Sequence, residues 1–192
     1  MAGHIGRAAD LAWAGLHEAY ALDASRGVEA AGRVYPLLWE ADRATELFEF
    51  STTTLLPVLD RAEPVARARF LVSRVEHLVA YGTPAEVREP AAQMMAALRG
   101  VNDPALEARA YLVSAWCYEA YGDFEQVEAE YERAAEIARN ASAPSMLALV
   151  LYNHAAFKID FLDLEGCVTL LDEVDALVER FGLRRYLVAS RR

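Results

Sequence analysis

Four histidines are the side chains of this sequence best suited to acid–base or metal chemistry. They stand at positions 4, 17, 77 and 154, and none lies in an H-E-x-x-H motif or another metal-ligating spacing. His77 and His154 fall in segments with helical character. For both, a contact with a ligand and an ordinary packed helix position remain open.

The sequence also contains no motif for a nucleophilic cysteine or serine. Cys117 and Cys167 are fifty residues apart and form no C-x-x-C pair, so we expect buried, reduced thiols rather than a disulfide or a zinc site. No G-x-S-x-G and no phosphate-binding loop occurs. We therefore predict a protein that is not an enzyme and that uses no cofactor and no metal; an enzyme with an unrecognised helical active site is a third alternative to the two functions given below.

Carboxylates recur at helical spacing. Glu128, Glu132 and Glu136 stand four residues apart, and a second acidic run extends from Asp172 to Glu179. Such a stripe is either an acidic docking surface or a solvated helix face. Catalytic carboxylates would need opposed, buried environments, which nothing in the sequence indicates.

The overall composition narrows the class of protein. Of 192 residues 55% are hydrophobic, which excludes a disordered chain, and the formal net charge is −10. This charge repels phosphate backbones and favours a basic partner, so we expect no direct nucleic-acid binding by this segment. The N-terminus lacks a signal peptide and no stretch is apolar enough to span a membrane, which predicts a cytoplasmic protein without membrane contact. Arginine makes up eighteen of the nineteen basic residues, as in a GC-rich bacterial genome.

Leucine, alanine, glutamate and arginine dominate the segments between turn signals, and both their type and their length favour helices. The sequence predicts an all-α fold of about nine helices. Their expected ranges are 5–22, 24–41, 43–61, 65–81, 84–99, 104–121, 124–139, 144–161 and 164–181. The Asp103-Pro104 pair and the Ser142-Ala143-Pro144 stretch start two of them.

Two turns with the same chemistry lie forty residues apart, at "AYGTPAEV" and "AYGDFEQV". In the first, Gly82 is expected to end a helix in a left-handed conformation, and Thr83, Pro84 and Glu86 then form a capping box with proline at the first helical position. In the second, Gly122 ends a helix and the following aspartate caps the next. Units that recur with this period indicate stacked helix pairs.

The repeat is clear over residues 65–181 and divergent over 1–64, and we interpret 1–192 as one helical-repeat domain. Residues 182–192 restart the pattern, which favours a segment cut from a longer protein over a short cap. Pro36, Pro57 and Pro90 fall inside predicted helices and imply kinks. The segment 50–58 could be a broken helix or a loop.

The unit from residue 108 to 139 resembles a tetratricopeptide (TPR) repeat. Its first helix matches the family pattern at Tyr111, Ala115 and Tyr118, and its second helix matches at Tyr131 and Ala134. The turn Gly122-Asp123-Phe124 also matches. Ser114, Val127 and Arg139 depart from the pattern, and Val87, Ala155 and Cys167 occupy small-residue positions of neighbouring units.

A period of forty residues is longer than that of an ordinary TPR and is similar to the repeat domain of MalT/LuxR-type bacterial transcriptional regulators. This resemblance implies an α-α superhelix of antiparallel helix pairs that senses a small effector or contacts partner subunits. We therefore expect a non-enzymatic interaction or sensor domain, part of such a regulator, that binds a protein, a peptide or a small-molecule effector. A free-standing TPR adaptor is the alternative, HEAT-like repeats have similar lengths, and a homodimer stays open.

The TPR positions place a partner groove on the first helices of the units. The residues expected to line it are Arg69, Glu76, Arg109, Leu112, Trp116, Glu119 and Tyr152. Trp116 and Tyr152 beside charged side chains would suit a peptide or a small apolar effector. A core position for Trp116 is the alternative.

Overall fold

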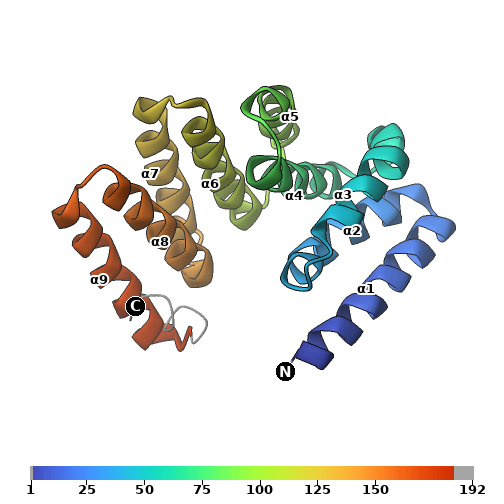
Figure 1. Cartoon of the computed structure of the whole chain (residues 1–192), viewed down its shortest axis with the longest axis horizontal. Helices are drawn as coiled ribbons and strands as arrows, with labels where there is room; N and C mark the ends of the chain where they lie inside the picture. The colour runs from blue at the N-terminus through green and yellow to red at the C-terminus, as the bar shows by residue number, and fades with distance from the viewer. Residues whose placement is uncertain (1, 184–192) are drawn as a thin grey trace. The chain divides into compact units, whose positions relative to one another are not determined.

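The computed structural model describes residues 2–183, and this part of the chain is all-α, with nine α-helices and no strand (Figure 1). The predicted helices are confirmed to within a few residues at each end, except for the range 43–61, where the α-helix ends at Phe50. The helices are α1 (Ala2–Leu22), α2 (Ala24–Glu40), α3 (Ala44–Phe50), α4 (Pro64–Tyr81), α5 (Pro84–Ala97), α6 (Pro104–Tyr121), α7 (Phe124–Asn140), α8 (Pro144–Asp160) and α9 (Leu164–Phe181). The predicted restart of the pattern lies, from residue 184 on, outside the described residues.

The chain divides into two compact units, residues 1–102 and 103–192, which we describe separately. In the first unit, α1 packs on α2, α2 on α4, and α4 on α5. In the second unit, α6 packs on α7, α7 on α8 and α8 on α9, and α6 also contacts α8. The interpretation of the chain as one domain remains a prediction.

Of the two alternatives predicted for residues 50–58, a broken helix or a loop, the structure shows a broken helix. It continues as a π-helical turn (Ser51–Leu55) and a 3₁₀ turn (Leu56–Arg61). The hydroxyl groups of Ser51 and Thr52 both donate to the carbonyl oxygen of Phe48, at 2.8 Å, and so compete with the regular helical hydrogen bonds. Pro57 lacks an amide donor, which removes another of these bonds.

The two glycine turns differ in conformation. Gly122 is left-handed, with a φ of 73°, as predicted for a helix C-terminus. Gly82 has a φ of −91° and a ψ of −178°, so the prediction of a left-handed Gly82 is wrong. The cause is the next residue: the Thr83 amide and hydroxyl both donate to the Glu86 carboxylate, at 2.8 and 2.7 Å, and the amide is not free to bond back to the helix that ends. The reciprocal pairing of Thr83 and Glu86 is confirmed.

Asp123 is a second correction. It occupies the N-cap position of α7, but its side chain makes no capping hydrogen bond. Asp103 and Asp163, at the starts of α6 and α9, do accept such bonds, from the amides of Leu106 and Gly166. The repeated turns therefore occupy the same position between paired helices, but their capping hydrogen bonds differ.

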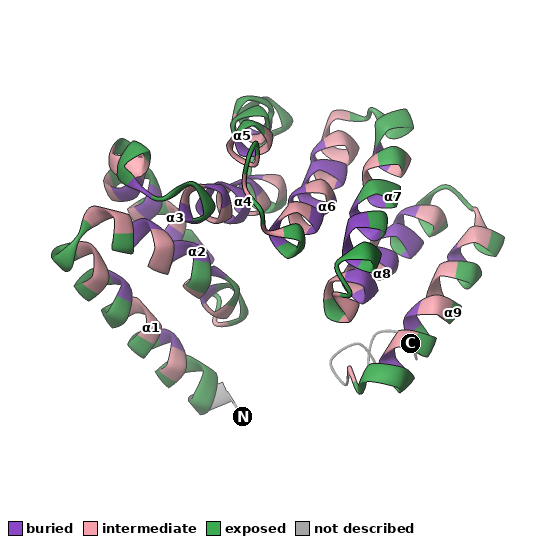
Figure 2. Ribbon diagram, turned by 180° about the vertical axis from the view of Figure 1, so that it is seen from behind, coloured by how far each residue is buried: buried purple, intermediate pink, exposed green. Residues whose placement is uncertain are grey.

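The core of the second unit uses the small positions of the repeat. Ala115 and Ala134 are buried in the same cluster as the ring of Tyr131, and Ala155 is buried as well. Small side chains let the helix axes approach, and the aromatic ring fills the remaining space. Figure 2 shows buried residues along α6, α7 and α8, whereas α9 is exposed over more of its surface.

Candidate functional site

The predicted groove residues are divided between the two units. Arg69 and Glu76 lie on α4 of the first unit, whereas the other five lie on α6 and α8 of the second. A joint groove therefore stays a prediction. Leu112 is a correction, because its side chain has no exposed surface and belongs to the hydrophobic core.

On α6 and α8, Trp116 and Tyr152 are partly buried and pack against the core of the second unit. Glu119 is already engaged: its Oε1 accepts a hydrogen bond from the Tyr131 hydroxyl at 2.7 Å. Burial raises the pKa of Glu119 above its ordinary value. These side chains are thus mainly parts of the packed unit, which agrees with the core alternative for Trp116.

A second group of side chains in this unit is joined by ion pairs. Lys158, the single lysine of the chain, forms ion pairs with Glu128 and with Asp163. His154 is buried, stacks on the ring of Tyr131 with centroids 5.0 Å apart, and lies 3.6 Å from Glu128. Burial lowers the pKa of His154. This histidine therefore occupies a packed position, and Glu128 of the acidic stripe is an internal ion-pair partner.

Large apolar side chains are exposed close to these ion pairs, at the same ends of the helices. They gather at the start of α7 and at the connection from α8 to α9, and their exposed fractions run from 47% to 83%. The rings of Phe124 and Phe161 contact each other, with centroids 4.8 Å apart. We call this surface the apolar ridge; it consists of Phe124, Phe161, Leu162, Leu164 and Val168.

Negative charge surrounds the apolar ridge. Asp123, Glu125, Asp160 and Glu165 are exposed at the same helix ends. The nearby cation, Lys158, is held by its two carboxylate partners. The ridge therefore combines an apolar surface with an acidic rim, which is the arrangement that favours a basic partner.

Leu162 has a left-handed backbone conformation, which is uncommon for residues other than glycine. It follows the end of α8 with a φ of 60°, and its side chain is 83% exposed. Its amide bonds to the carbonyl oxygen of Ile159, and the next amide bonds to that of Lys158, as in a Schellman motif. This position normally carries glycine. A leucine there gains little burial in return for its strain, which is typical of residues retained for function.

We expect Leu162→Gly to stabilise the protein by about 1 kcal/mol. A leucine in the left-handed region costs about 1–2 kcal/mol, part of which is offset by the greater freedom of glycine in the unfolded chain. Leu11→Gly is the matched control, because Leu11 is also exposed but lies inside a helix, where glycine should destabilise by about 1 kcal/mol. Urea denaturation of both variants measures the change in the free energy of unfolding, which should be positive for Leu162→Gly and negative for Leu11→Gly. A destabilised Leu162→Gly variant would contradict the argument from strain.

The first unit holds a pocket that the sequence did not predict. It has a volume of about 530 Å³ and lies between α3, α4 and α5. Its lining includes the aromatic rings of Phe48 and Tyr81, the side chains of Arg74 and His77, and two glutamates of α5, Glu86 and Glu89. We call it the aromatic pocket.

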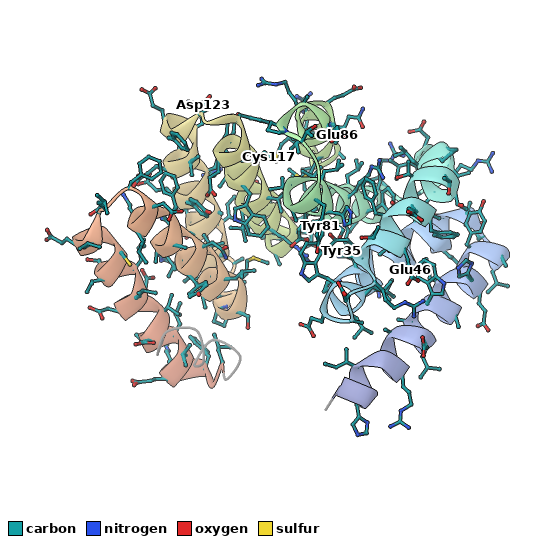
Figure 3. All side chains as sticks on the ribbon, in the orientation of Figure 1. Tyr35, Glu46, Tyr81, Glu86, Cys117 and Asp123 are labelled. Atoms are coloured by element: carbon teal, nitrogen blue, oxygen red, sulfur yellow. The ribbon has the colours of Figure 1, made fainter. Side chains whose placement is uncertain are left out.

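The rings around the aromatic pocket form one contact network. His77 stacks on Phe48, with centroids 4.3 Å apart and planes inclined by 15°, and Tyr81 contacts His77 at 4.8 Å. Trp39 of α2 contacts Tyr81 at 5.3 Å. Tyr35 and Tyr81 are labelled on α2 and α4 in Figure 3. The signal that could have found this cluster is a pair of i, i+4 aromatic spacings, Tyr35 to Trp39 and His77 to Tyr81.

Other classes of site find no support in the described part of the chain. Residues 4–183 contain no group of three histidine, cysteine, aspartate or glutamate side chains that could hold a metal ion. Cys117 and Cys167 are buried free thiols, as predicted, and burial raises the pKa of Cys117 to about 12. Among the described helices, none has both the length and the apolar character that a membrane span requires.

Comparison with known proteins adds no assignment. No protein-family model matches this sequence, and no curated protein does.

Proposed function

We propose that this chain is a non-enzymatic, TPR-like interaction domain that docks a basic, amphipathic helix of a protein partner. The apolar ridge is the observation that carries the proposal. Five large apolar side chains are exposed together at one end of the second unit, and their rim is acidic. A basic amphipathic helix offers the complementary apolar face and the complementary charge.

The packing of the helices supports a second part of this proposal, which concerns the kind of protein to which the domain belongs. Successive helices pair through buried small residues in both units, as stacked repeats require. We propose that these pairs form a TPR-like superhelix and that the domain is a segment of a bacterial transcriptional regulator of the MalT/LuxR type. A free-standing adaptor is the alternative. Reading the flanking gene sequence separates the two, since a regulator predicts an ATPase module upstream or a helix-turn-helix downstream.

Two synthetic peptides test the ridge directly. Both carry the same leucine face on a helix; one has an arginine- and lysine-rich polar face and the other a glutamate-rich polar face. We expect the basic peptide to bind and the acidic peptide not to bind, in a titration followed by calorimetry. The double variant Phe161→Ala/Leu164→Ala should weaken the basic peptide by about ten-fold or more, because it removes two apolar anchors.

Leu11→Ala is the matched control, since Leu11 is an exposed leucine of the other unit. It should leave the affinity of the basic peptide unchanged. Equal binding of the two peptides, or binding that the ridge variant does not weaken, would contradict the proposal. Concentration-dependent dimerisation that the ridge variant abolishes would also contradict it, because the occupant would then be a second copy of this chain.

A further inference from the structure

Arg74 is a half-buried cation without an ionic partner. Its Nη1 donates to the hydroxyls of Thr52 and Ser51, at 2.7 and 3.3 Å, and its guanidinium lies 4.5 Å from the centroid of the Phe48 ring. No carboxylate of residues 4–183 forms an ion pair with it. A guanidinium removed from water gains strongly from an anion that satisfies its remaining N–H groups.

The walls beside Arg74 are flat and apolar. The rings of Phe48 and His77 are stacked on each other, and the Tyr81 ring next to them is 62% exposed. Burial and the charge of Arg74 lower the pKa of His77, so its ring is neutral at pH 7. Such surfaces favour an aromatic ring of a ligand, which can stack on a ring face or meet its edge.

Two glutamates in the lining of the aromatic pocket limit the charge of the ligand. Glu86 and Glu89 of α5 line the same pocket as Arg74. Two carboxylates that line a pocket with one guanidinium disfavour a phosphate or a dicarboxylate, since each extra negative charge is repelled. The same carboxylates can accept a hydrogen bond from a hydroxyl or an N–H group of a ligand.

We propose that the aromatic pocket binds a small aromatic monocarboxylate that carries a hydroxyl or N–H donor at the other end of its ring. Arg74 holds the carboxylate, the rings of Phe48, His77 and Tyr81 hold the aromatic ring, and a glutamate of α5 accepts from the donor. The pocket volume of about 530 Å³ lies in the range of small-molecule sites. The pocket belongs to the first unit and the apolar ridge to the second, so this inference does not rest on the proposed function.

Calorimetric titration with 4-hydroxyphenylacetate tests the inference. We expect saturable binding of the acid and at least about ten-fold weaker binding of its uncharged amide, because only the acid satisfies Arg74. Arg74→Gln should reduce the affinity for the acid to that for the amide. Arg33→Gln is the matched control, since Arg33 is an exposed arginine of the same unit paired with Glu29, and it should change nothing.

Tryptophan fluorescence locates the bound acid. Because Trp39 contacts Tyr81 and His77, a ligand-induced change in emission should disappear in Trp39→Phe and persist in Trp116→Phe. Equal affinity of acid and amide for the wild-type chain would overturn the proposal, and this comparison holds even where a variant fails to fold. A folded Arg74→Gln variant with unchanged affinity would overturn it too. Binding of the basic peptide to the ridge is unaffected by either result.

Discussion

Replacing Tyr131 by alanine should lower the free energy of unfolding of the second unit by about 3–5 kcal/mol, the range for large aromatic core residues. Only 1% of the Tyr131 side chain is exposed, and it lies in the core between α6, α7 and α8. The ring stacks on His154 and its hydroxyl donates to Glu119. Alanine would leave a cavity and would also leave the half-buried carboxylate of Glu119 without its donor.

Two further variants separate these contributions. Tyr131→Phe keeps the ring and removes the hydroxyl, which should cost about 1–2 kcal/mol through the lost hydrogen bond to Glu119. Phe124→Ala removes an exposed aromatic ring from the same helix and should change the stability by less than about 1 kcal/mol. Urea denaturation followed by circular dichroism measures all three. A Tyr131→Ala variant no less stable than Tyr131→Phe would show that the ring does not support the core.

The helices could be predicted from the sequence because their signals are local. Proline at the first helical position of α4, α5, α6 and α8 and glycine after α6 and α9 mark the ends whatever the rest of the chain does. The small positions of the TPR pattern were also informative, since Ala115 and Ala134 can be replaced by nothing larger where helices approach closely. These features gave the fold class and almost every boundary.

The faces of the helices could not be predicted in the same way. Helix α6 is apolar over most of its circumference, and Leu112, Val113 and Ala115 are all buried, so the pattern does not say which side meets a partner. The predicted groove position of Leu112 was therefore wrong, although the helix that contains Leu112 was predicted correctly. The conformation of Gly82 was missed for a related reason: a carboxylate three residues on from Thr83 captures the amide that a left-handed turn would use.

Both candidate surfaces depend on contacts that the sequence does not show. The aromatic pocket brings Phe48 of α3 beside Arg74 of α4 and Glu89 of α5, and this depends on how a broken helix packs on its neighbours. The apolar ridge joins Phe124 to Phe161 across thirty-seven positions of the chain. Leu162 is an exception among the ridge residues, because its unusual position can be recognised from the sequence. Once the end of the helix is known, a leucine stands where a glycine is usual.

Acidification should destabilise the chain through two buried histidines. Burial lowers the pKa of His77 and of His154 below the ordinary value of 6.5, so the unfolded chain takes up these protons first as the pH falls. Their contribution to stability is present above pH 6.5 and is lost as the pH falls from there towards the folded pKa values. The slope is at most about 1.4 kcal/mol per pH unit for each histidine.

The charges facing each ring decide which histidine dominates. At His77 burial and the cation of Arg74 both lower the pKa, whereas at His154 burial and the cation of Lys158 lower the pKa and the carboxylates of Glu128 and Glu132 partly offset them. We therefore expect His77→Phe to flatten the pH dependence more than His154→Phe. Each phenylalanine can keep the ring contact, with Phe48 or with Tyr131.

Denaturant unfolding of the wild type and the variants between about pH 7.5 and about pH 5.5 measures this dependence. At lower pH the opposite sign enters, since burial raises the pKa of Glu119 and of Glu130 and their protonation then favours the folded state. If the His77→Phe variant kept the full pH dependence of the wild type in this window, the neutral ring assigned to the aromatic pocket would have to be abandoned.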